Sequence, residues 1–187
     1  VTVDPTPFDS GTTLLATSMG GSAPPPGRGN YARLGLIYDT RDREIGPTAG
    51  TWAEALVQSA NKSFGATENY TRWTVSLRHY TPITARLIYA QRLLAQGTTG
   101  DVPFHELATL QGSYKAQDGL GGSSSIRGLP KDRYVGKAVM LSNSELRWRA
   151  ADFGLLGRPS YLVPSSFVDA GRVWSDGMNS DGLLRGL

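Results

Sequence analysis

One arginine and two acids are the residues of this sequence best suited to a specific ionic contact. Arg127 lies in a loop rich in glycine and serine, residues 119–129, and Gly128 follows it directly. Glu145 and Asp169 are isolated acids on two later strand-like segments. Guanidinium and carboxylate groups form bidentate, charge-assisted hydrogen bonds. The three residues are therefore candidate partners if both strands line an enclosed space.

Simpler interpretations of the same residues stay open at this point. Arg127 on a long polar loop could be a solvated surface arginine. Glu145 could be an ordinary partner of a nearby cation, Arg147 or Arg149. A glycine after the arginine permits a sharp backbone turn, which either arrangement can use.

A pair of acids, Asp39 and Asp42, could in principle perform hydrolysis. They stand in a connection rich in glycine and proline, with no histidine nearby. Turn capping and local pairing with Arg41 and Arg43 is the better interpretation. We therefore expect this segment to be structural.

Other reactive patterns are incomplete. The stretch 119–125 lacks the Gly-Lys-Ser/Thr ending of a phosphate-binding loop. His79 and His105 do not have metal-ligand spacing, and the sequence contains no cysteine. The acidic stretch 176–182 is out of register for a calcium loop. We expect no enzyme activity, no metal and no cofactor.

Composition favours an all-β protein. The 187 residues suffice for one domain with a core, and 23 glycines and 11 prolines suit a chain with many turns. The net charge is only +3, and its cations are scattered rather than grouped. Nucleic acid is therefore not an expected partner. No apolar run is long enough for a transmembrane helix, whereas membrane strands need only about 9–11 alternating residues.

Alternating segments predict about seven antiparallel strands. The clearest are residues 33–39, 51–60, 70–80, 84–96, 137–149 and 161–171, with a weaker candidate at 8–18 and an unfinished strand that ends at 187. One face of these segments carries full charges. In a soluble sandwich that face is the wet outside, whereas in a membrane barrel it lines the lumen. Alternation fits both architectures.

Connection lengths favour the barrel. A short turn at 81–83 alternates with longer connections at 61–69 and 97–135, which is the outer-membrane pattern. We predict 81–83 and 150–160 on one rim, and 61–69, 97–135 and 174–182 on the other. The segment 97–135 is expected to be too polar for the core. The side chains predicted to face lipid are Leu34, Leu36, Trp73, Val75, Leu77, Leu87, Tyr89, Met140, Leu146 and Val168.

The order of short motifs resembles a known family. The motifs are Asp39-Thr-Arg-Asp42 with Gly46-Pro-Thr-Ala-Gly50, Pro103-Phe104, Gly121 to Gly128, Glu145-Leu-Arg147, and Phe167-Val-Asp-Ala-Gly171. Together they resemble the bacterial surface-antigen barrel, the membrane part of the superfamily that contains BamA, TamA and the two-partner secretion transporters. The similarity extends from about Leu34 to the end of the chain.

The resemblance implies a barrel of about sixteen strands whose sixth outer loop folds back into the lumen. That loop is 97–135 here, and its signature is Ile126-Arg127-Gly128-Leu129, in which Leu129 departs from the usual aromatic residue. Arg127 is then expected to pair with Asp169, with Glu145 as second acceptor. The turn motif, expected to be structural, comprises Asp39, Arg41, Asp42, Pro47 and Gly50.

The resemblance also implies a function in the bacterial outer membrane. We expect a BamA-like factor that inserts or translocates unfolded outer-membrane proteins, in contact with outer-membrane lipid and accessory subunits. The alternatives are a two-partner secretion transporter and the membrane anchor of a fused patatin-like enzyme. Because so few strands cannot close a membrane barrel, residues 1–187 are expected to be a fragment of the C-terminal barrel domain, without its POTRA domains and remaining strands.

Overall fold

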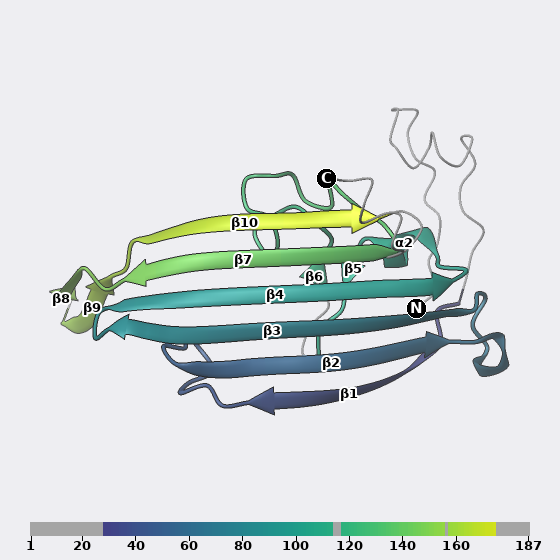
Figure 1. Cartoon of the computed structure of the whole chain (residues 1–187), viewed down its shortest axis with the longest axis horizontal. Coiled ribbons are helices and arrows are strands. Elements are labelled where there is room, and N and C mark those ends of the chain that lie inside the picture. The colour runs from purple at the N-terminus through teal and green to yellow at the C-terminus, as the bar shows by residue number, and fades with distance from the viewer. Residues whose placement is uncertain (1–27, 114–116, 156, 175–187) are drawn as a thin grey trace.

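Six long antiparallel strands form one continuous sheet in the computed structural model, which describes residues 28–113, 117–155 and 157–174. The order in the sheet is β1-β2-β3-β4-β7-β10 (Figure 1). This confirms the predicted all-β, antiparallel class, and the open sheet corresponds to a partial barrel. The bounds are β1 Tyr31–Asp39, β2 Gly50–Ala60, β3 Tyr70–Thr84, β4 Leu87–Gly100, β7 Ala138–Trp148 and β10 Ser165–Trp174.

The two faces of the sheet have the polarity of a membrane barrel rather than of a soluble sandwich. The inner face, defined here as the one that carries Glu54, Arg72 and Gln96, buries polar side chains: Arg72 is 1% exposed. The outer face exposes apolar ones, with Leu34 at 79%. The side chains predicted to face lipid follow this division. Leu87 and Tyr89 are half-buried, and the others are exposed: Leu34, Leu36, Trp73, Val75, Leu77, Met140, Leu146 and Val168.

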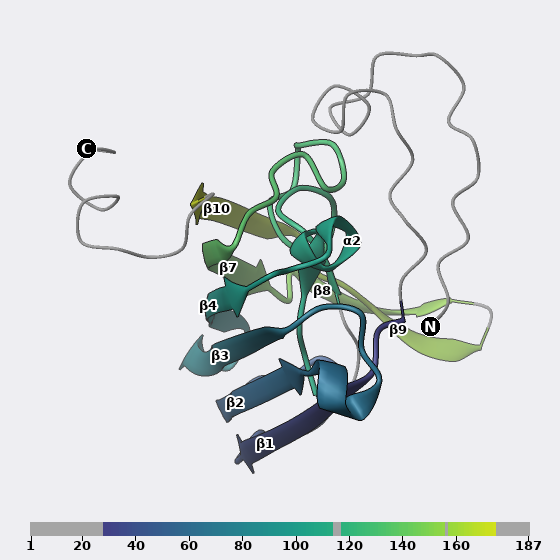
Figure 2. The ribbon, with the colours of Figure 1, turned by 90° about the vertical axis from the view of Figure 1, so that its right-hand side faces the viewer.

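The segment between β4 and β7 folds back over the inner face of the sheet, as Figure 2 shows in a view along the strands. It contains the short helix α2 (Phe104–Leu107) and the two-residue strands β5 (Thr109–Leu110) and β6 (Gln117–Asp118). We call residues 101–137 the inner segment. It begins later than the expected 97–135, because residues 97–100 continue β4 and pair with β3.

The predicted rims are confirmed for the described connections. The β3–β4 turn lies at the same end of the sheet as the hairpin of β8 (Ala151–Leu155) and β9 (Arg158–Leu162) (Figure 1). The β2–β3 connection, which contains the 3₁₀ helix η1 (Lys62–Phe64), lies at the opposite end together with α2. Antiparallel pairing of consecutive strands forces this alternation.

The tight turn was predicted at 81–83, and this position is wrong. Strand β3 continues to Thr84, Pro82 stays in register with Ile88, and a bulge separates Pro82 from Thr84. The turn forms at the next two residues, because the Thr84 hydroxyl accepts the backbone N–H groups of Arg86 and Leu87 at 3.2 and 3.0 Å. The hydroxyl thus satisfies donors that the turn would otherwise leave open.

The predicted single strand 161–171 is also wrong. Residues up to Leu162 belong to β9, and β10 begins only at Ser165. Pro164 has no N–H to continue a ladder, while its carbonyl accepts the Trp148 N–H at 3.0 Å. The expected connection 150–160 is therefore the greater part of a paired hairpin.

The expectation that 97–135 contributes nothing to the core is wrong as well. Leu110 and Leu120 of the inner segment are each 1% exposed. They pack with side chains of β4 and β7, so that the apolar cluster comprises Leu94, Leu110, Leu120, Val139 and Leu141. Two separated leucines in a polar segment show no periodicity, so the sequence pattern did not reveal them.

Some predicted elements fall outside the described residues: the strand at 8–18, the hairpin tip at 175–182 and the final strand. Within the part of the chain that the structure describes, no helix is long and apolar enough to span a membrane.

Candidate functional site

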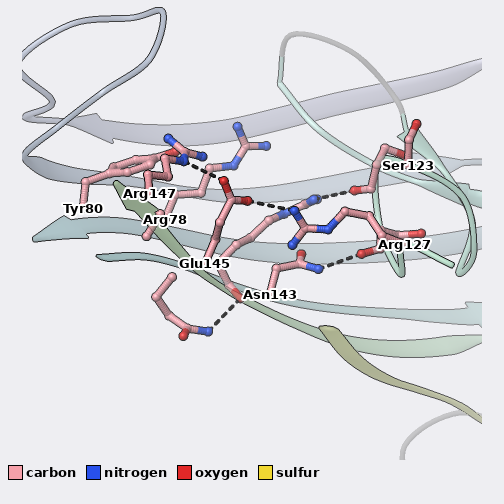
Figure 3. A pocket seen from close by; sticks show the side chains of 12 residues that line it. Arg78, Tyr80, Ser123, Arg127, Asn143, Glu145 and Arg147 are labelled. Atoms are coloured by element: carbon pink, nitrogen blue, oxygen red, sulfur yellow. Dashed lines mark hydrogen bonds and ion pairs between the residues drawn. The ribbon is translucent and has the colours of Figure 1, made fainter. Parts of the chain in front are cut away.

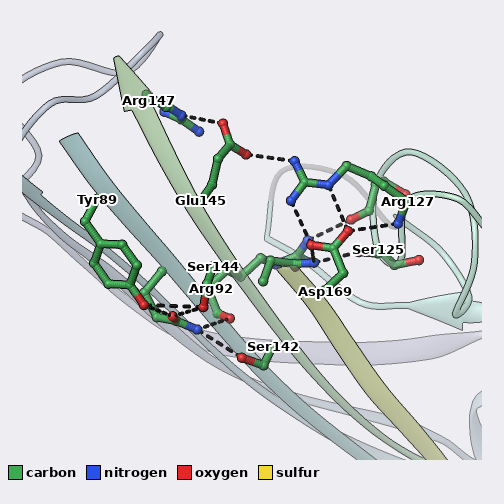
Figure 4. A network of polar contacts seen from close by, with 12 residues as sticks. Tyr89, Arg92, Ser125, Arg127, Ser142, Ser144, Glu145, Arg147 and Asp169 are labelled. Atoms are coloured by element: carbon green, nitrogen blue, oxygen red, sulfur yellow. Dashed lines mark hydrogen bonds and ion pairs between the residues drawn. The ribbon is translucent and has the colours of Figure 1, made fainter. Parts of the chain in front are cut away.

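Arg127 of the inner segment contacts both acids that the sequence singles out. Its Nε and one terminal nitrogen donate to the two oxygens of Asp169 at 2.8 and 2.7 Å, and its backbone N–H donates to the same carboxylate at 2.9 Å. The other terminal nitrogen donates to Glu145 Oε2 at 2.8 Å (Figure 4). The expected geometry of Arg127, Asp169 and Glu145 is therefore present, with both acids on the inner face.

Glu145 satisfies both of the roles considered for it. Its second oxygen accepts a hydrogen bond from Arg147 Nε at 2.8 Å, so the carboxylate bridges two arginines. Hydrogen bonding to Asp169 is the main cause that raises the pKa of Arg127 above its ordinary value. The guanidinium is therefore held in its charged form, and the contact is an ion pair wherever the two carboxylates are ionised.

Asn143 completes the network and was not assigned a role from the sequence. Strands β7 and β10 pair in a register that sets Asn143 directly opposite Asp169 and Glu145 opposite Phe167. The Asn143 amide donates to Asp169 at 2.8 Å and to the Ser125 carbonyl at 2.6 Å. The alternation of the sequence predicts that the Asn143 side chain faces inward. The strand register that sets Asn143 opposite Asp169 is not visible in the sequence.

Phe167 supplies the aromatic surface that Leu129 does not. The Arg127 Cζ lies 3.6 Å from the centre of the Phe167 ring, within cation–π distance. Leu129 itself is 37% exposed. Arg127 therefore stacks on an aromatic ring even though Leu129 is not aromatic. The ring is that of Phe167 in strand β10, not that of a loop residue.

Residues 119–129, the tip of the inner segment, are held in shape by their own hydrogen bonds. The buried Ser125 hydroxyl donates to the Gly119 carbonyl and accepts the Gly121 N–H, both at 2.9 Å. Gly121 and Gly128 have positive φ values of 116° and 92°, which other residues rarely adopt. The loop composition therefore permits the turns that point Arg127 at β10.

Ile126 and Gly171 form an apolar contact beside the ion pair. Ile126 packs against the apolar cluster, and a Cβ on Gly171 would lie 2.8 Å from both Ile126 Cδ1 and Leu120 Cδ2. A side chain at position 171 would push the inner segment away from β10. Gly171 had no role in the sequence interpretation beyond its place in a motif.

A second ionic contact holds the start of the inner segment. Arg72 of β3 donates to the Glu106 carboxylate at 2.7 Å and to the Glu106 carbonyl at 2.6 Å, and its Nε donates to Thr98. Nearby, Gln96 donates to the Thr109 carbonyl, and Glu54 accepts the Ser113 N–H. The inner segment is thus attached to the sheet in its first part, between Glu106 and Ser113, and again at Arg127.

The turn motif is local, as expected. Arg41 pairs with Asp39 at 2.8 Å, and Asp42 accepts the N–H groups of Thr48 and Ala49 at 2.9 and 3.2 Å. Hydrogen bonds, led by the Thr48 hydroxyl, hold the pKa of Asp42 well below its ordinary value.

One proline and one glycine complete this motif. Pro47 is buried, and Gly50 has φ of 99°, where a Cβ would lie 2.3 Å from the Thr40 carbonyl. Only glycine therefore fits at position 50 without moving the backbone. The structure places the motif between β1 and β2, away from Arg127.

The described residues contain no cluster of three or more His, Asp or Glu side chains that could hold a metal ion. The site holds a segment of the chain in place. Ion pairs fix the inner segment on the polar face of a sheet whose other face is apolar. This combination defines the membrane part of a bacterial outer-membrane β-barrel protein.

Comparison with known proteins identifies the family. The Omp85 superfamily domain matches residues 29–186, and the chain belongs to that superfamily. Over 124 residues, which are 66% of this chain, it is 26% identical to the outer membrane transporter CdiB of Dickeya dadantii (strain 3937). The matched part spans about a fifth of that relative's length. The resemblance inferred from the motifs is confirmed, and the chain is part of a protein of the bacterial outer membrane.

Proposed function

We propose that this chain forms part of the channel of an outer-membrane transporter that passes an extended polypeptide along the inner face of its barrel. The observation that carries this choice over a BamA-like insertase is the similarity to a relative named as an outer membrane transporter. The inner face carries polar side chains such as Arg72, Thr74 and Gln96, which is typical of the interior of a barrel that holds a passage. The two-partner secretion alternative is thus preferred to the insertase first expected.

In this proposal the inner segment sets the width of the passage. Residues 119–129 form its tip, Asp169 and Glu145 hold Arg127 within that tip, and Arg72 holds Glu106 at the start of the segment. A guanidinium that is bound to two carboxylates has a defined position. Loss of either attachment would let the segment move across the inner face.

Insertion of other outer-membrane proteins is the second candidate. Among the described residues β1 and β10 are the edges of the six-stranded sheet. An exposed edge can pair with a strand of another chain by β-augmentation. For either candidate function, we propose that residues 1–187 belong to a C-terminal barrel domain. The remaining strands of that barrel and the separate POTRA domains would then lie elsewhere in the protein. Outer-membrane lipid and accessory subunits are the proposed partners.

A deletion strain separates the two candidates. We expect loss of the gene to remove one or a few polypeptides from the culture medium while the amounts of folded porins in the outer membrane stay unchanged. Complementation with the intact gene should restore secretion, and Arg127→Ala should restore it only in part. A general fall in folded porins with an unchanged medium would refute transport and support insertion.

A further inference from the structure

A pocket of about 290 Å³ lies on the inner face beside Arg127 and is lined mainly by arginine and polar side chains. Figure 3 shows Arg78, Arg127 and Arg147 around it, with Glu145 between the last two. Arg92 and the loop serines 123–125 complete the arginine and serine lining. The pocket is adjacent to the Arg127 network but is not filled by it.

Most of these arginines already have acceptors. Arg127 is bound by Asp169 and Glu145, Arg147 by Glu145, and Arg92 donates to the Ser124 carbonyl at 2.8 Å. Three acids offset this charge: Asp169, Glu145, and Glu54, whose carboxylate interacts electrostatically with Arg92 and accepts the Ser113 N–H. Four arginines against these acids leave the surroundings of the pocket positive.

Arg78 is the cation that these contacts do not neutralise. Among the described residues it makes no ion pair, and its Nε is buried without a hydrogen-bond partner. Its Cζ lies 4.6 Å from the centre of the Trp52 ring, so an aromatic surface supports the guanidinium. Arg147 is supported in the same way by Tyr80, at 5.8 Å. Stacking of this kind holds the planar groups while leaving their edges available for hydrogen bonds.

A partly buried guanidinium without an acceptor is costly, because desolvation of charge needs compensation. An anion with two oxygens would supply it, since a carboxylate matches the fork of a guanidinium. Lipid headgroups are poorly placed to do so, because the pocket opens on the inner face and the apolar surface is on the other.

We propose that this pocket binds the carboxylate side chains of a polypeptide that occupies the barrel, with Arg78 as the principal contact. Its volume of about 290 Å³ admits an acidic side chain with water, but not a folded element. The inference deepens the proposed transport function and rests on it for the identity of the ligand. Acidic residues of the substrate would then bind transiently beside the Arg127 contact.

The test uses the purified full-length protein in detergent and two flexible Gly-Ser peptides that differ only in carrying Glu or Gln. Calorimetry should show that the Glu peptide binds about tenfold or more tightly, as expected for a charged hydrogen bond. Arg78→Gln should abolish the preference, and Arg78→Lys should retain part of it. Arg86→Gln is the matched control, because Arg86 is a rim arginine, 56% exposed, that pairs with Asp152.

Equal binding of the two peptides by the wild-type protein, or equal losses in Arg78→Gln and Arg86→Gln, would overturn the inference. Inorganic phosphate that binds through Arg78 without any Glu preference would also overturn it, in favour of a soluble anion. The heat-dependent gel mobility of folded barrels shows whether each variant folds, and Arg78→Lys keeps the test decisive if Arg78→Gln does not fold. Peptide binding is measured without secretion, so a protein that binds the Glu peptide but secretes nothing would refute transport alone.

Discussion

The guanidinium of Arg127 lies 3.6 Å above the ring of Phe167, and Asp169, two residues further along the same strand, holds it from the side. Side chains two residues apart in a strand lie on the same face. One strand therefore provides both an aromatic surface and a carboxylate, and the adjacent strand provides Glu145 as the third contact. This enclosure on three sides leads to the first prediction.

Arg127→Ala should detach the tip of the inner segment. The change leaves two carboxylates, Asp169 and Glu145, without their shared cation, and the lost charged hydrogen bonds are worth about 1.5–3 kcal/mol each in similar contexts. Hydrogen exchange at residues 119–129 should accelerate. Asp169→Asn should have a smaller effect, because an amide oxygen still accepts one hydrogen bond. Arg158→Ala, at an exposed position in β9, is the control. Unchanged hydrogen exchange in Arg127→Ala would contradict the claim that Arg127 holds the tip in place.

Gly171→Ala should disturb the same tip without touching a charge. The new Cβ would lie 2.8 Å from Ile126 and Leu120, and such overpacking costs about 1–3 kcal/mol. Thermal unfolding should occur at lower temperature. Combining the change with Ile126→Ala should recover part of the loss, because the two side chains compete for one space. Gly154→Ala, where a Cβ meets nothing within 4 Å, should be neutral; equal effects at both glycines would exclude the steric explanation.

The turn motif should lose stability in acid through Asp42. Its folded-state pKa lies below the ordinary value of about 3.9. A depressed pKa means that its contribution is complete above the ordinary value and is lost as the pH falls through the folded one. Hydrogen exchange of residues 40–50 should therefore rise selectively below about pH 4. In Asp42→Asn it should already be raised at neutral pH, with a weaker acid response; an identical acid response in both proteins would assign the titration to another group.

A charge on the outer face should hinder membrane folding. Val75 lies on β3 with its side chain 50% exposed, and an arginine at the bilayer midplane of a barrel costs about 2–4 kcal/mol. Val75→Arg should therefore fold less completely into lipid vesicles, as measured by heat-dependent gel mobility. Ile45→Arg is the matched control at a connection residue that is 89% exposed. If both variants folded equally well, the outer face would not be the lipid-facing surface.

Local alternation was sufficient to locate the six long strands but not their ends, and it did not reveal the β8–β9 hairpin. The period of two follows from strand geometry, so side chains such as Val75 and Arg72 were correctly assigned to opposite faces. The boundaries at Thr84 and Ser165 depended on one hydroxyl and one proline, whose effects are set by neighbouring backbone groups. Those effects are not expressed in the hydrophobic pattern.

The sequence by itself determined which segments alternate as strands and which face each side chain occupies. Its motifs also carried the family resemblance, and that resemblance led to the expected contact of Arg127 with Asp169 and Glu145. Only the tertiary structure decided that Asn143, Phe167 and Gly171 complete that contact, and that Leu110 and Leu120 belong to the apolar cluster. The physical reason is that alternation specifies which face a side chain occupies, whereas partners depend on strand register and on the path of the inner segment. Both are set by contacts between residues far apart in the chain.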